Sequence, residues 1–120
     1  MEAVSFEIAK KLKEKGFKTE NTNWCYLDGD LVQVNKYINI SPYEYAPTIS
    51  QVLKWLREEK LILIGLSPMQ EYDVEETIEW CAVVYKADKQ GGLSFKEEVY
   101  YESYEQAAIA GIEYVLNNLI

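Results

Sequence analysis

The 120-residue chain contains no histidine and only two cysteines, Cys25 and Cys81. Without an imidazole, Ser-His and Cys-His activation of a nucleophile is excluded, and so is general base catalysis by histidine. Zinc sites with a His ligand are excluded as well, and two thiols are too few for a structural site of three or four thiolates. Residue types alone therefore exclude many enzyme classes.

Long hydrophobic runs are also missing. The longest apolar stretch, Leu61–Leu66, is far shorter than the roughly 20 residues that cross a bilayer, and no signal-like apolar run follows the N-terminus. We therefore expect a cytoplasmic protein with no membrane partner. In a reducing compartment, we expect Cys25 and Cys81 to be free thiols packed in apolar strands, in preference to a disulfide or a reactive thiol.

A glycine-rich phosphate loop is absent, because Gly91-Gly92 is not followed by the Lys-Ser/Thr pair and helix of a P-loop. We expect no nucleotide and no other cofactor. Asp28 and Asp30 would be oxygen ligands in a cation site, but the further oxygens of a calcium loop do not follow at the required spacing. The favoured interpretation is a hairpin turn at Asp28-Gly29, because this pair suits the positive φ angles of a type I′ turn.

Apolar residues make up 48% of the chain, which is enough for one core, and we expect a single domain over residues 1–120. Periodicity predicts three helices. The first covers Ser5–Lys15, has its first residue as N-cap and ends at Gly16. The second covers Thr48–Lys60 and opens on a capping box, and the third begins at Ser103.

Strand-like patterns lie between these helices. Residues 24–34 predict a hairpin, and Leu61–Leu66 and Thr77–Lys86 are apolar enough to be buried strands that pair with each other. Phe95–Tyr101 is a candidate for a further short strand. Tyr37–Ala46 contains three tyrosines and a proline, so an irregular loop and an edge strand both remain open.

Together these elements predict an α+β fold. We expect a single layer of mostly antiparallel sheet, with four to five strands and about three helices, in the order α-β-β-α-β-β-(β)-α. On the last helix, the small residues Ala108 and Gly111 lie on the apolar face, which predicts a close approach to a neighbouring element.

Several sequence patterns resemble one family. They are KEKGF, the W-x-Y of Trp24 and Tyr26, APTISQVLKWL at residues 46–56, and the terminal YESYEQAAIAGIEYVLNNLI. Together they resemble a family of small uncharacterised proteins from bacteriophages and mobile elements of gut Bacteroidetes. The most specific piece is the APTI block with the amphipathic helix that follows it. The resemblance implies an origin, carries no functional residue over, and leaves residues 63–99 without a matching pattern.

The negative charge is concentrated in the second half of the chain. Residues 1–20, 21–66 and 67–120 carry five, four and three Lys or Arg against four, five and eleven acids, giving +1, −1 and −8. Phosphate binding depends on clustered Lys and Arg, and here these are largely balanced by neighbouring acids. We therefore expect no direct binding to nucleic acid.

The candidate interaction surface is the densest acidic stretch together with nearby tyrosines. Its residues are Glu71, Tyr72, Asp73, Glu75, Glu76, Glu79, Tyr43 and Tyr45. Three interpretations stay open: a solvated surface that serves solubility, a docking surface for a basic protein, and a catalytic pair of carboxylates. Glu97, Glu98, Glu102 and Glu105 would extend the acidic surface, although Glu102 and Glu105 also suit the start of a helix. Tyr100 and Tyr101 would extend an aromatic patch.

The function predicted from these features is that of a non-enzymatic accessory protein of a phage or mobile element. It would bind a host or self-encoded protein, one that carries positive charge, through the acidic, tyrosine-rich surface. The alternatives are a small carboxylate-dependent hydrolase and a structural subunit that forms a homo-oligomer.

Overall fold

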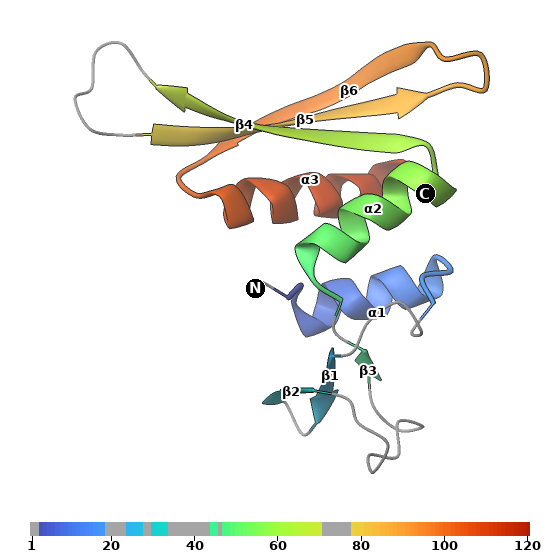
Figure 1. The fold of residues 1–120 in the computed structure, drawn as a ribbon, viewed down its shortest axis with the longest axis vertical. Coiled ribbons are helices and arrows are strands. Elements are labelled where there is room, and N and C mark those ends of the chain that lie inside the picture. Colours follow the sequence, from blue (N-terminus) through green and yellow to red (C-terminus); the bar gives the residue numbers. More distant parts are fainter. Residues whose placement is uncertain (1–2, 19–23, 28–29, 34–43, 46, 71–77) are drawn as a thin grey trace. The chain divides into compact units, whose positions relative to one another are not determined.

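The computed structural model describes residues 3–18, 24–27, 30–33, 44–45, 47–70 and 78–120 (Figure 1). The chain divides into two compact units, Met1–Val52 and Leu53–Ile120, and each is described by itself. Whether residues 1–120 form a single domain stays a prediction. Among the described residues, no helix is long and apolar enough to cross a membrane.

The first helix of the N-terminal unit, α1 (Phe6–Glu14), begins and ends as the sequence predicts. The Ser5 side chain accepts a hydrogen bond from Ile8 N at 3.3 Å, which satisfies a free amide of the first turn. At the other end Gly16 has φ +99°, a left-handed conformation that favours glycine. Phe17 N then donates to Leu12 O at 2.9 Å, so the helix ends in a Schellman motif.

The described residues of this unit also contain three short strands, β1 (Trp24–Leu27), β2 (Asp30–Gln33) and β3 (Glu44–Tyr45). They form an antiparallel sheet in the order β2-β1-β3, in which Leu27 pairs with Asp30. The predicted hairpin is confirmed, although its turn residues, 28 and 29, lie outside the described part. For Tyr37–Ala46, the sequence left an irregular loop and an edge strand open. In the structure β3 is an edge strand, and residues 37–43 and 46 are not described.

Helix α2 (Ile49–Glu59) spans the boundary between the two units. Its predicted capping box is present, because Thr48 N donates to Gln51 Oε1 at 2.9 Å and Gln51 N donates to Thr48 Oγ1 at 3.2 Å. Directly after the helix, Leu61 has φ +57°, and its carbonyl accepts a hydrogen bond from Ala87 N at 2.7 Å. This bond ties the end of α2 to the sheet of the C-terminal unit.

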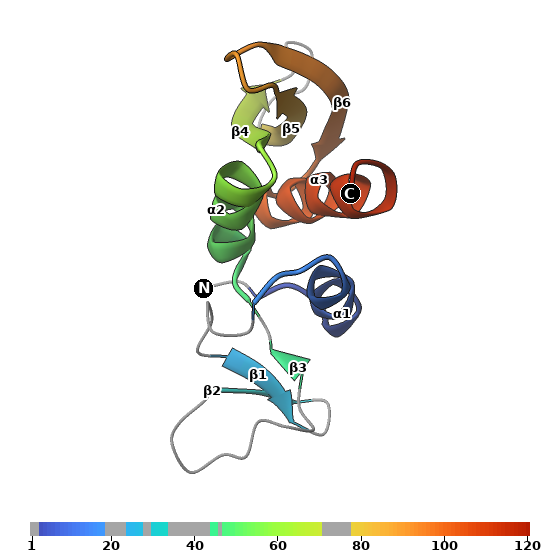
Figure 2. The same cartoon turned by 90° about the vertical axis from the view of Figure 1, so that its right-hand side faces the viewer.

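The C-terminal unit contains a second sheet, made of β4 (Ile62–Gln70), β5 (Ile78–Ala87) and β6 (Leu93–Tyr101), and the helix α3 (Tyr104–Asn118). The sheet is antiparallel in the order β4-β5-β6. The predicted pairing of the two apolar strands is therefore confirmed, and the segment 95–101 is a strand. Figure 2 shows this sheet nearly end-on, with α3 against one of its sides.

Packing of α3 on the sheet depends on a small residue. A Cβ atom added at Gly111 would lie 3.1 Å from Ile64 Cγ2 and 3.7 Å from Ala82 Cβ. Ile112 and Val115, on the same helix, are fully buried, and Trp80 meets Tyr104 edge-to-face at 5.2 Å between ring centroids. The predicted close approach at Gly111 is confirmed.

The α+β class and the three helices are confirmed, but the expected single sheet of four to five strands and its order are not. The described strands form two three-stranded sheets. In each of them the described strands pair with strands that are near in the sequence, as antiparallel strands joined by short connections do.

Candidate interaction surface

The two faces of the C-terminal sheet follow from its register. Side chains alternate along a strand, and residues paired across an antiparallel ladder share a face. On β5, Ala82 and Val84 are directed toward α3, so Cys81, Val83 and Tyr85 lie on the opposite side. We call that opposite side the open face, because no described element of the C-terminal unit packs on it (Figure 1).

The open face is defined by these register pairs. It consists of Leu63, Gly65, Ser67 and Met69 from β4, Glu79, Cys81, Val83, Tyr85 and Ala87 from β5, and Leu93, Phe95, Glu98 and Tyr100 from β6.

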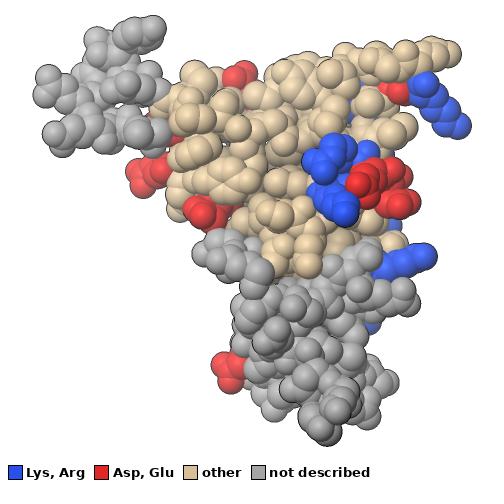
Figure 3. Space-filling view, viewed as in Figure 1, with Lys and Arg blue, Asp and Glu red and all other residues tan. Residues whose placement is uncertain are grey.

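Large apolar side chains are exposed on the open face. The exposed fractions are 59% for Phe95, 58% for Leu93, 48% for Tyr100 and 43% for Met69. Phe95 and Tyr85 form an edge-to-face pair with ring centroids 6.2 Å apart, so they make one aromatic cluster across two strands. Figure 3 shows that uncharged residues make up most of the visible surface of this sheet. Several large apolar side chains exposed on one face are typical of an interaction site.

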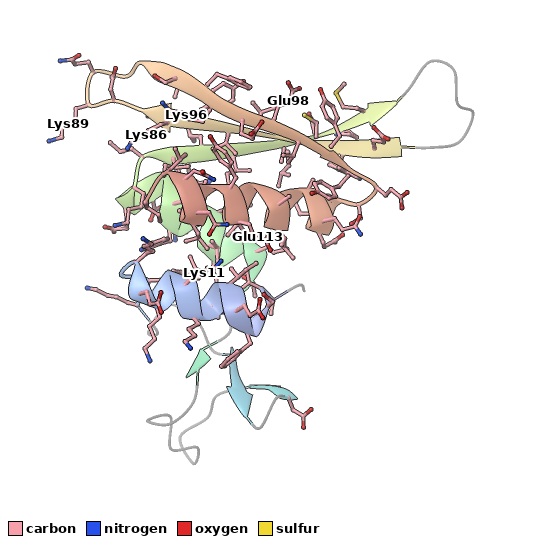
Figure 4. The ribbon with its side chains drawn as sticks, turned by 180° about the vertical axis from the view of Figure 1, so that it is seen from behind. Lys11, Lys86, Lys89, Lys96, Glu98 and Glu113 are labelled. Carbon is pink, nitrogen blue, oxygen red and sulfur yellow. The ribbon has the colours of Figure 1, made fainter. Side chains whose placement is uncertain are left out.

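A carboxylate is held within the open face. Tyr100 donates its hydroxyl to Glu98 Oε1 at 2.5 Å, and the Cys81 thiol donates to the same oxygen at 3.5 Å. Glu98 Oε2 accepts no hydrogen bond from the described residues. Figure 4 shows Glu98 on the side of the sheet away from α3. The arrangement fixes one oxygen and leaves the other available to a partner.

Protonation states in this cluster follow from the same contacts. The hydrogen bond to Glu98 raises the pKa of Tyr100 to about 12, with smaller contributions from burial and from the charge of Glu98. Burial, followed by the hydrogen bond to Glu98 and its negative charge, raises the pKa of the Cys81 thiol. A buried thiol with a raised pKa is a poor nucleophile, so the cluster positions Glu98 and does not activate Cys81.

The two edges of the sheet are both protected against pairing with another strand. Edge strand β4 carries Pro68, which has no N–H to donate. Edge strand β6 has an irregular register between Phe95 and Glu97, and the carbonyl of Lys96 at that bulge accepts the Tyr114 hydroxyl at 3.3 Å. Prolines, bulges and lysines are features that block edge-to-edge association. The face is therefore the accessible part of this sheet.

The predicted site residues fall mostly outside the described part of the chain. Glu71, Tyr72, Asp73, Glu75, Glu76 and Tyr43 are not among the described residues. Tyr45 lies on β3 in the N-terminal unit, whereas Glu79 lies half-buried on the open face opposite Met69. Of the two described residues of the predicted surface, Glu79 lies on the open face and Tyr45 does not.

Leu93 and Phe95 are exposed residues of the open face that the sequence analysis did not identify, and neither did it identify the contact of the buried Cys81 with Glu98. Leu93 and Phe95 alternate as expected for one face of a strand, which is a usable signal. The bulge then shifts the alternation, so that Glu98 and Tyr100 share their face. Glu97 and Glu98 are consecutive residues in the regular register that follows the bulge, so they lie on opposite faces and do not form a converging catalytic pair.

Among the described residues, no three Cys, Asp or Glu side chains lie close enough together to hold a metal ion. Cys81 is a free, buried thiol as predicted, and the side chain of Cys25 lies outside the described part. No protein-family model, curated protein or solved structure matches the chain.

Proposed function

We propose that this chain is a non-enzymatic accessory protein that binds another protein through the open face of its C-terminal sheet. The observation that carries the proposal is the exposure of four large side chains on that face, Leu93 and Phe95 toward one end of β5 and Tyr100 and Met69 toward the other. Covering a side chain as large as Phe or Leu contributes about 1.5–3 kcal/mol, so a partner that covers several of these side chains would gain measurable affinity.

The composition of β5 supports the proposal. This central strand is apolar on both sides, with Ala82 and Val84 toward α3 and Cys81, Val83 and Tyr85 on the open face. Strands that are apolar on both sides are typical of sheets covered on both faces. In the C-terminal unit α3 covers one of them, which leaves the other for a partner.

A cytoplasmic accessory role in a bacteriophage or mobile element forms part of this proposal, and its support is the sequence resemblance alone. The acidic stretch Glu71–Glu79 joins the open face through Glu79, which pairs with Met69. A partner with positive charge would therefore be attracted to both, because complementary charge speeds and orients encounters.

Affinity capture with matched variants tests the proposal. The tagged wild-type chain and its Phe95→Ser and Phe6→Ser variants are incubated with a bacterial lysate at low and high salt, and the retained proteins are identified. Phe6 lies on α1 and is exposed to a comparable extent, 47%. We expect Phe95→Ser to lose proteins that the wild type and Phe6→Ser retain. Identical sets of retained proteins for all three chains would refute binding through the open face.

A further inference from the structure

We infer that the open face binds an amphipathic helix of a partner protein, one that presents an apolar stripe flanked by Lys or Arg. The inference rests on the proposed function and specifies the chemistry of its partner. Three observations lead to it: the dimensions of the face, the charges on it, and the protection of the sheet edges.

The dimensions of the face fit one helix. Strands β4 and β6 have nine residues each, and at about 3.3 Å per residue such a strand is about 30 Å long. Three strands spaced about 4.8 Å apart leave a surface about 10 Å wide between the outer strand axes. A helix of about 20 residues is about 30 Å long and about 10 Å in diameter, so a single helix covers the face.

The charged groups of the open face have one sign. Its register positions include two acids, Glu79 and Glu98, and no Lys or Arg. Lys96, the single base of β6, occupies the bulge outside this pairing. Because Tyr100 and Cys81 hold Glu98 Oε1, the free Oε2 is oriented before a partner arrives. A Lys or Arg beside the apolar stripe would then form a charge-assisted hydrogen bond with a carboxylate that loses little rotamer freedom.

Two other occupants fit these observations less well. An added strand would require a free edge, whereas Pro68 and the bulge at Lys96 protect both edges. A second copy stacked face to face would place Glu79 and Glu98 of both copies in one interface, with no Lys or Arg at any register position to offset them. A basic amphipathic helix can cover the exposed apolar side chains and also pair with the carboxylates.

Binding of designed peptides tests the partner chemistry directly. The probe is a fluorescein-labelled peptide of about 18 residues, with Leu at the i, i+3, i+4 and i+7 positions and Lys elsewhere. Its matched control has Glu in place of every Lys. Fluorescence anisotropy with the full chain measures both affinities at two salt concentrations. We expect the Lys peptide to bind, and the Glu peptide to bind at least about tenfold more weakly.

Variants of the chain locate the binding. We expect Phe95→Ser and, independently, Leu93→Ser to weaken binding of the Lys peptide about tenfold, since each removes a side chain that the helix would cover. Glu98→Gln should weaken it about threefold and reduce its salt dependence. Glu113→Gln is the matched control, because Glu113 is exposed on α3 and lies away from the open face (Figure 4). Near-UV circular dichroism confirms that each variant is folded.

Three results would overturn the inference: equal binding of the Lys and Glu peptides, equal weakening by Glu98→Gln and Glu113→Gln, or a wild-type dimer in light scattering that Phe95→Ser converts to a monomer. If the lysate capture depends on Phe95 while the Lys peptide does not bind the open face, the partner chemistry is wrong and the proposed function survives. If the capture does not depend on Phe95, the proposed function itself fails.

Discussion

The two faces of the C-terminal sheet are built from alternate residues of the same strands, yet α3 covers only one of them. On the covered face, Ile62 and Val84 are buried and Gly111 lets α3 approach Ile64. On the open face, Leu93 and Phe95 remain exposed although they are as apolar as their covered counterparts. The sheet therefore has more apolar surface than α3 covers. Substitutions on the two faces test this difference.

The largest difference in stability should come from truncating one large aliphatic side chain at the covered face and one on the open face. Ile112 is fully buried on α3, so Ile112→Ala should reduce the free energy of unfolding by about 3 kcal/mol through lost packing and a cavity. Leu93 is exposed on the open face, so Leu93→Ala should change it by less than about 0.5 kcal/mol. Urea unfolding of both variants measures these values, and equal losses would mean that the faces are not differently covered.

Much of the local structure could be predicted from the sequence. Ser5, Thr48 and Ser103 begin helices because each can accept a backbone hydrogen bond, and such signals are local. The open face could not be predicted from such local signals. The bulge that brings Glu98 and Tyr100 to the same face as Phe95 arises from pairing with β5, a long-range contact that no short pattern in β6 specifies.

The same limit applies to sheet assignment. Asp28-Gly29 and the apolar strands 61–66 and 77–86 predicted which neighbours pair, because the connecting segments are short. Whether β1–β3 and β4–β6 form one sheet or two depends on backbone hydrogen bonds between edge strands that are far apart in the sequence. The local side-chain pattern does not specify such long-range pairing. The sequence therefore predicted the pairs correctly and the number of sheets wrongly.

Identical substitutions at two glycines should change stability in opposite directions. At Gly111 on the covered face, valine would clash with Ile64, so Gly111→Val should cost about 2 kcal/mol of unfolding free energy. At Gly65 on the open face, the nearest atom to an added Cβ is Val83 O at 4.0 Å, and a strand favours β-branched residues. Gly65→Val should therefore stabilise the protein by up to about 1 kcal/mol. Thermal unfolding of both variants checks the signs, and a loss at both sites would show that the open face is also tightly packed.

The smallest expected effect concerns the hydrogen bond that fixes Glu98 on the open face. Tyr100 has a pKa of about 12 in the folded protein against an ordinary value of 10.0. A group whose pKa is raised by folding stabilises the folded state below its unfolded pKa and loses that contribution as the pH rises through the folded value. The stability that Tyr100 contributes should therefore be complete below about pH 10 and decline between about pH 10 and 12.

Wild type and the Tyr100→Phe variant should accordingly differ in unfolding free energy near pH 8 and converge near pH 12, as measured by urea unfolding at each pH. Spectrophotometric titration of tyrosine gives an independent reading, because Tyr100→Phe should remove a phenol that ionises near pH 12 and not one that ionises near pH 10. In the Glu98→Gln control, the phenol of Tyr100 should ionise closer to its ordinary pKa, since the charged acceptor is gone. If the titration of Tyr100 is unchanged in Glu98→Gln, the carboxylate is not held by this hydroxyl, and the oriented Oε2 on which the basic-helix inference depends loses its support.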